Sequence, residues 1–229
     1  MTAEVILILF IGGITLGAIL YRKNSLATFL VNNLSATPPS QDIALETLLE
    51  IAGRYYAEKN YLSAEKAYLK VLRVDHKNSL AYSRLGFIYS HLGNTDDAIE
   101  CFTIVADTYP NAASYHNLAM MYFKNRDFEH SAEALEKSLS METHFSRLIN
   151  LARIYRIMNK FDLQLQTLQK AHALEPENIE AMQLLAEAYL HENDEKSARL
   201  LFRKIIKIDP ENLRARAGLQ PIGQLKKPH

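Results

Sequence analysis

This chain of 229 residues has a single cysteine, no net charge and no glycine-rich loop. The single cysteine, Cys101, excludes an internal disulfide framework and a metal cluster held by several cysteines. Lys and Arg number 26, and so do Asp and Glu, so no overall charge draws the chain to nucleic acid. The eight glycines are scattered and form no phosphate-binding loop.

Catalytic and metal-binding motifs are missing as well. Neither GxGxxG, GxxxxGK(S/T) nor HExxH occurs, and no two of the eight histidines stand four residues apart as a metal pair would. Cys101 precedes Phe102 in an apolar stretch, which is typical of a packing residue and not of a nucleophile. We therefore expect no enzyme activity, no metal and no cofactor.

One long apolar run is present at the start of the chain. Residues 5–20 carry no charge, and eleven of these sixteen are Val, Ile, Leu or Phe. A cleaved signal peptide would need a basic start and a small-residue cleavage site, whereas Glu4 precedes the run and no such site follows. A buried globular helix is the other alternative. The run predicts a transmembrane anchor over residues 4–21.

The flanks of this run suggest an orientation. Arg22 and Lys23 follow it, so the positive-inside rule places the N-terminus outside and the rest of the chain in the cytoplasm. Gly13 and Gly17 have the spacing that lets two membrane helices approach closely, although glycine is also common in such helices. We expect residues 22–41 to be a juxtamembrane segment and linker, which Pro38 and Pro39 interrupt.

The remainder of the chain repeats itself five times. A large apolar residue and a small residue are followed three positions later by tyrosine. The small residues recur at intervals of 34, 33, 33 and 34, as do the tyrosines. They are Ala52, Gly86, Ala119, Ala152 and Ala186, followed by Tyr55, Tyr89, Tyr122, Tyr155 and Tyr189.

Each repeat has the pattern of two helices. The first has apolar residues at helical spacing, and the second pairs a small residue with a large one, as in Ala98 with Phe102 and Ala198 with Phe202. Small residues let the two helices cross closely while large ones fill the space beside them. We expect the tyrosines to belong to the core. Gln164 takes the small-residue place in repeat four.

This pattern resembles the tetratricopeptide repeat (TPR) over residues 45–211. The resemblance implies an all-α fold, a right-handed α-solenoid of about five helix pairs, preceded here by one transmembrane helix. The TPR domain would occupy residues 42–211, with a capping helix at 212–220 and a tail at 221–229. The repeats would cover residues 45–78, 79–111, 112–144, 145–178 and 179–211.

A TPR array implies a concave surface lined by its first helices, where an extended peptide would bind. Asn117 and Asn150 could bond a peptide backbone, and Arg153 and Arg156 could pair with an acidic group or a terminal carboxylate. The alternative is that these are ordinary solvated side chains. The candidate groove residues are Arg84, Phe87, His116, Asn117, Met120, Lys124, Asn150, Arg153 and Arg156.

These features together predict a membrane-anchored scaffold that binds protein or peptide partners at the cytoplasmic membrane surface, without catalysis. Two alternatives remain at this point. The chain could be a self-assembling structural protein, a homo-oligomer joined through its anchors or solenoid ends. It could also be a non-catalytic subunit of a membrane enzyme or assembly complex.

Overall fold

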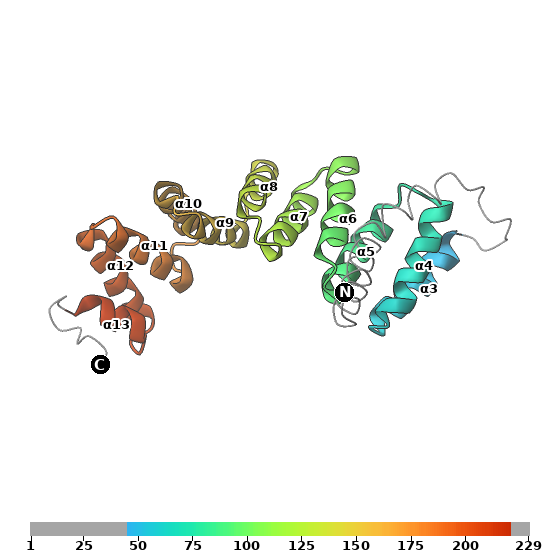
Figure 1. Ribbon diagram of the computed structural model, residues 1–229. Coiled ribbons are helices and arrows are strands. Elements are labelled where there is room, and N and C mark those ends of the chain that lie inside the picture. The colour runs from blue at the N-terminus through green and yellow to red at the C-terminus, as the bar shows by residue number, and fades with distance from the viewer. Residues whose placement is uncertain (1–44, 221–229) are drawn as a thin grey trace, which may run out of the picture. The chain divides into compact units, whose positions relative to one another are not determined.

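The computed structural model describes residues 45–220, and within that range it is all-α, with eleven helices and no strand. The helices follow one another with short connections (Figure 1). Their bounds are α3 Leu45–Ala57, α4 Tyr61–Val74, α5 Ser79–Leu92, α6 Thr95–Thr108, α7 Ala112–Lys124, α8 Phe128–Met141, α9 Phe145–Ile157, α10 Phe161–Leu174, α11 Ile179–His191, α12 Glu195–Ile208 and α13 Leu213–Leu219.

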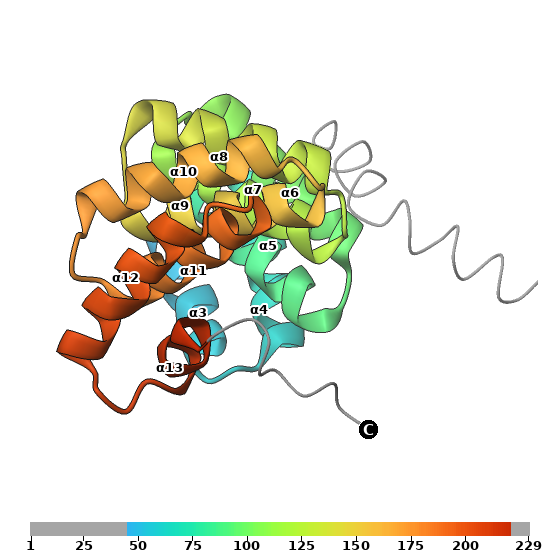
Figure 2. The ribbon, with the colours of Figure 1, turned by 90° about the vertical axis from the view of Figure 1, so that its left-hand side faces the viewer.

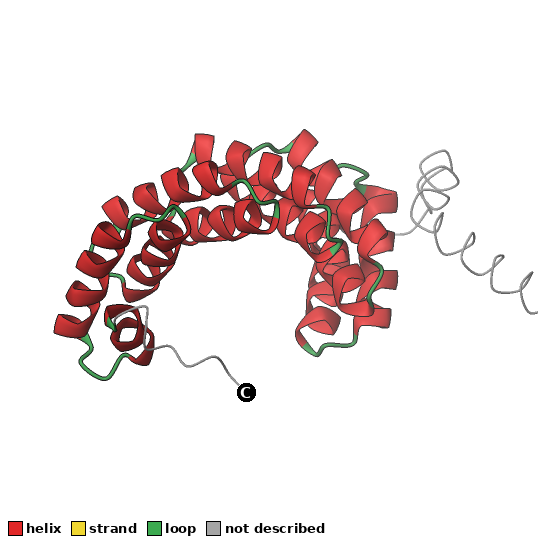
Figure 3. Cartoon of the chain, turned by 60° about the vertical axis from the view of Figure 1, so that its left-hand side comes forward, coloured by secondary structure: helices red, strands yellow, loops and turns green. Residues whose placement is uncertain are grey.

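The expected TPR-like helix pairs are confirmed. The odd-numbered helices from α3 to α11 are the first helices of the repeats, and the even-numbered ones are the second helices. The chain divides into two compact units, one with α3–α7 and the other with α8–α13. Within each unit the helices form two layers (Figure 3), and in the second unit α10 and α12 lie on the outer side with α11 further in (Figure 2).

The predicted anchor at residues 4–21, with Gly13 and Gly17, lies outside the described residues. So do the juxtamembrane segment and linker at 22–41 and the tail at 221–229. Between residues 45 and 220, none of the helices combines the length and the hydropathy that a bilayer crossing requires.

Capping side chains define where most helices begin. Asn60, Asn78 and Asp194, for example, each accept a hydrogen bond from a backbone N–H in the first turn of the helix that follows. Such a bond satisfies one of the donors that a helix N-terminus leaves without a partner. Lys160, at the corresponding place before α10, makes no such bond.

The turn inside each repeat contains one residue in the left-handed region, with φ between 57° and 79°. Only one of the five is glycine, the residue that adopts this conformation without steric cost. They recur in phase with the repeats and are Lys59, Gly93, Arg126, Asn159 and Asn193.

The predicted small and large residues form the core. Phe102 and Leu135 are fully buried, and Phe202 is 4% exposed. Gly86 lies against the Phe102 ring, where a Cβ would be 2.7 Å from the nearest ring atom. Gln164 also fits the core, since it is only 6% exposed. The small residues therefore act as predicted, by letting a bulky partner approach the backbone.

The expectation that every tyrosine of the repeat is core was wrong for the first one. Tyr89 and Tyr155 are 3% and 5% exposed, whereas Tyr55 is 36% exposed. Tyr55 belongs to α3, the first helix of the described residues. Tyr122 and Tyr189 are half-buried, so two of the five tyrosines, Tyr89 and Tyr155, lie fully in the core.

Candidate functional site

In the first unit, the predicted groove residues lie on α5 and α7, and two of them make aromatic contacts. The Arg84 guanidinium sits over the ring of Tyr56 from α3, 4.7 Å from its centroid. Phe87 meets Phe102 edge to face, with ring centroids 5.0 Å apart. Arg84 is thus held in place by a cation–π contact, and Phe87 is shared between the surface and the core.

The α7 residues of the predicted groove are half-buried or exposed. His116, Asn117 and Met120 are half-buried, and Lys124 is exposed at the end of the helix. The Lys124 ammonium donates hydrogen bonds to the carbonyl oxygen of Ser90 and to its hydroxyl, the latter at 3.0 Å. Lys124 therefore ties α7 to the C-terminal end of α5, where a cation is favoured by the helix dipole.

In the second unit the predicted cations are already paired. Arg153 donates a 2.5 Å hydrogen bond to Glu180, and Arg156 lies 3.8 Å from Glu187. Arg214 of α13 also reaches Glu187, at 3.5 Å. These pairs join α9, α11 and α13 along their exposed side. An acidic ligand would have to exchange with Glu180 or Glu187 to reach either arginine.

The structure places six of the nine predicted groove residues in the first unit and three in the second, where Asn150 is half-buried on α9. We call the exposed side of α3, α5 and α7 the N-terminal face and that of α9, α11 and α13 the C-terminal face. The N-terminal face exposes apolar side chains, with Leu80 47% and Phe123 38% exposed. The C-terminal face presents the ion pairs described above.

Sequence reasoning missed Tyr56, because its role depends on the neighbouring helix supplying Arg84. It also missed what the two histidines at one repeat position do. His91 stacks on Tyr61 at 4.9 Å, and His191 stacks on Phe161 at 3.8 Å. In both cases the aromatic ring begins the second helix of the preceding repeat. The sequence signal for these two contacts was that His91 and His191 occupy the same position within their repeats.

The described residues give little support for a reactive nucleophile or a metal site. Cys101 is fully buried, and burial, followed by the charges of Glu100 and Asp97, raises the pKa of its thiol well above the ordinary value. Such a thiol stays protonated and is a poor nucleophile. From residue 45 to 220, no cluster of three or more His, Cys, Asp or Glu side chains could hold a metal ion.

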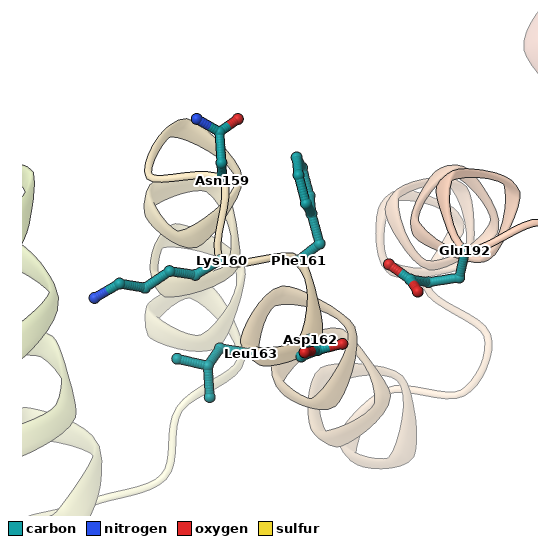
Figure 4. A pocket seen from close by; sticks show the side chains of 6 residues that line it. All are labelled: Asn159, Lys160, Phe161, Asp162, Leu163 and Glu192. Carbon is teal, nitrogen blue, oxygen red and sulfur yellow. The ribbon is translucent and has the colours of Figure 1, made fainter.

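The pockets of the second unit are open hollows on its surface. One lies at the turn between α9 and α10, where the side chains of Lys160 and Phe161 point in different directions and Glu192 faces them from the end of α11 (Figure 4). Another lies between α8 and α10 over α9 and includes Tyr155, whose hydroxyl donates a hydrogen bond to Glu136. Polar side chains line this second hollow beside the Tyr155–Glu136 pair, among them Gln166, Thr167 and Lys170.

Comparison with known proteins identifies the class. Three family profiles, each described as tetratricopeptide repeat, match residues 67–100, 111–145 and 165–220. The chain belongs to the tetratricopeptide repeat family.

Individual relatives are distant. The crystal structure of MamA protein superposes with a TM-score of 0.66 at 22% identity, covering 78% of this chain and 97% of that one. YrrB, described as a TPR protein with an unusual peptide-binding site, gives a TM-score of 0.64 at 16% identity, covering 75% and 89%. At such identities the likeness shows the fold alone.

A curated relative, the inactive peptidyl-prolyl cis-trans isomerase shutdown of Bombyx mori, is 24% identical over 168 residues. The match covers 72% of this chain but spans only 35% of that relative's length.

Proposed function

We propose that this chain is a membrane-anchored, non-catalytic TPR scaffold that binds a protein or peptide partner on its N-terminal face. The observation that carries the proposal is the exposure of apolar side chains there, with Leu80 47% and Phe123 38% exposed. Neither side chain is among the buried residues of the core. Exposed apolar groups beside half-buried polar ones are typical of surfaces that bind other proteins.

The polar groups on this face favour an extended peptide. Asn117 carries both an amide donor and a carbonyl acceptor, which match the backbone of an extended chain. Arg84 is held over Tyr56, so less side-chain freedom is lost when it contacts a ligand. The description of YrrB as a TPR protein with a peptide-binding site is consistent with this use of the fold.

The C-terminal face, taken by itself, offers a separate place for an acidic group of a partner. Arg153 and Arg156 can bind a carboxylate only if Glu180 and Glu187 release them. Because these pairs are about half exposed, each contributes at most about 1 kcal/mol, so such an exchange is feasible. A partner that combines basic and acidic residues could pair with both members of each ion pair.

The anchor remains a proposal that rests on the sequence of residues 4–21. It is tested by extracting membranes of cells that express the full chain with alkaline carbonate. The chain should stay with the membranes, and deletion of residues 2–23 should release it. Protease added to sealed vesicles with the cytoplasmic side outward should digest the TPR domain. Protection of that domain would reverse the proposed orientation.

Peptide binding is tested by selecting ligands for the full chain from a random peptide library. We expect Arg84→Ala and Phe123→Ser to weaken the selected peptides about tenfold or more, as for residues at the centre of an interface. The matched control is Leu174→Ser, which changes a side chain that is 49% exposed on α10. Equal affinities in the three variants would overturn the proposed site.

A further inference from the structure

The outward side of α12 combines cations and large aliphatic side chains in one stripe. Residues 196, 200, 204 and 208 follow one another at intervals of four, so they lie on one side of the helix. Over its 14 residues α12 has five basic side chains and one acidic side chain, Glu195. The exposed stripe consists of Lys196, Leu200, Arg203, Lys204, Lys207 and Ile208.

The aliphatic members of this stripe are not needed by the core. Leu200 is 57% exposed and Ile208 is 50% exposed, whereas Leu201, Phe202 and Ile205 on the opposite side are buried. The inner side of α12 therefore completes the core of the second unit by itself. The outer stripe adds apolar surface that folding does not use.

The cations of the stripe are largely uncompensated. Glu195 pairs with Arg199, at 3.9 Å, and Asp209 is engaged by Asn212. Within the described part of the chain, Arg203, Lys204 and Lys207 make no ion pair with a carboxylate. Burial, and then the charge of Lys204, lower the pKa of His172 on α10, so Lys204 has no negative partner on that side.

We propose that the α12 stripe binds the surface of a membrane rich in anionic lipids. Lysine and arginine would contact lipid phosphates, while Leu200 and Ile208 would enter the boundary between headgroups and acyl chains. A nucleic acid backbone would satisfy the cations but would leave both aliphatic side chains in water. The second helix α8 lacks this combination, since it carries Glu129, Glu133 and Glu136, whereas α4 has a shorter version of it with exposed Leu62, Lys66, Lys70 and Val74.

This proposal does not rest on the predicted anchor, since the anchor would hold the chain at any bilayer whatever its charge. The experiment uses the full chain with Leu200→Cys labelled by an environment-sensitive fluorophore. Cys101 is fully buried and would not compete for the label. The matched probe site is Met141→Cys on the acidic helix α8, where the methionine is 50% exposed.

Vesicles of phosphatidylcholine alone are compared with vesicles in which a third of the lipid is phosphatidylglycerol. The emission of the probe at position 200 should shift to the blue only on the anionic vesicles, and the probe at position 141 should not respond. High salt should weaken the shift. A shift of equal size on neutral vesicles, or no shift on anionic ones, would overturn the proposal.

Two charge-reversal variants separate the stripe from the net charge. Lys204→Glu with Lys207→Glu should weaken the response to anionic vesicles about tenfold or more, since each cation near an anionic surface contributes about fivefold. Lys59→Glu with Lys77→Glu makes the same change of charge at exposed sites of the first unit and should have little effect. Equal losses in the two variants would contradict the assignment to α12. Equal binding of soluble polyglutamate, without a blue shift, would indicate an acidic protein partner and also overturn the proposal.

Discussion

Gly86 lies so close to Phe102 that a Cβ at this glycine would be 2.7 Å from the aromatic ring. Because Phe102 is fully buried, the ring has little room to move. We expect Gly86→Ala to destabilise the first unit by about 1 kcal/mol or more, since overpacking outweighs the gain in helix propensity. Chemical denaturation followed by circular dichroism measures the change.

Gly53 provides the matched control, because nothing lies within 4 Å of the position that its Cβ would take. Gly53→Ala in the middle of α3 should stabilise the chain by up to about 1 kcal/mol. If both alanine variants changed stability in the same direction, the close approach of Gly86 to Phe102 would not be the cause.

The helix pairs could be predicted from the sequence because their signals are local. A small residue and a tyrosine three positions later recur in every first helix, and each helix is stabilised mainly by contacts within its own repeat and the next. The left-handed turn residues were harder to find. Gly93, and more weakly Asn159 and Asn193, carry a sequence signal for this conformation, whereas Lys59 and Arg126 adopt it because the helix pair on either side fixes the turn.

The sequence predicted the candidate site less completely than the helix pairs. The site depends on contacts between residues that are far apart in the sequence. Arg153 and Glu180 are 27 positions apart, and their contact requires the packing of α9 against α11. The sequence therefore indicated which charges are present on the first helices but not that they neutralise one another. The cation–π contact of Arg84 with Tyr56 escaped prediction for the same reason.

One substitution should give α10 the N-terminal cap that it lacks. Lys160 has φ −89° and ψ 67°, nearly the backbone conformation of Asp194 before α12, which has φ −87° and ψ 69°. Asp194 accepts a 3.1 Å hydrogen bond from the backbone N–H of Ser197, whereas Lys160 makes no capping bond. Lys160→Asp should therefore stabilise the chain by about 1 kcal/mol.

The converse variant removes the existing N-terminal cap of α12. Asp194→Ala removes the bond to Ser197 and should destabilise the chain by about 1 kcal/mol. Thermal unfolding of both variants beside the natural chain gives the two values. A loss of stability in Lys160→Asp would mean that the charge of Lys160 has a role at the turn that capping does not replace.

Releasing Arg153 from its ion pair offers a test of the charge preference on the C-terminal face. Glu180→Gln removes the negative partner and should change stability by less than about 1 kcal/mol, because the Arg153 and Glu180 side chains are 49% and 48% exposed. Peptides with an acidic group should then bind about two- to tenfold more tightly, at low salt in particular. Isothermal titration with one acidic peptide and its amide analogue measures this gain, and a gain for the amide analogue alone would contradict the role of charge.

The stability of the second unit should decrease in mild acid because of His172. Burial, and then the charge of Lys204, lower the pKa of His172 from its ordinary value of 6.5. Between the lowered pKa and 6.5, the unfolded chain binds more protons at this residue than the folded chain does. Its contribution to the free energy of unfolding is therefore complete above pH 6.5 and is lost as the pH falls through the folded-state pKa.

His172→Leu should reduce the fall in the unfolding midpoint between neutral pH and mild acid, and Lys204→Met should reduce it in part. The pKa of His130 is shifted in the opposite direction, because a hydrogen bond to Asp127 and the charge of that residue raise it. Protonated His130 stabilises the fold in acid, and this contribution is lost as the pH rises, so His130→Gln should make the chain less stable in acid. Identical pH profiles for His172→Leu and the natural chain would show that burial beside Lys204 does not control this titration.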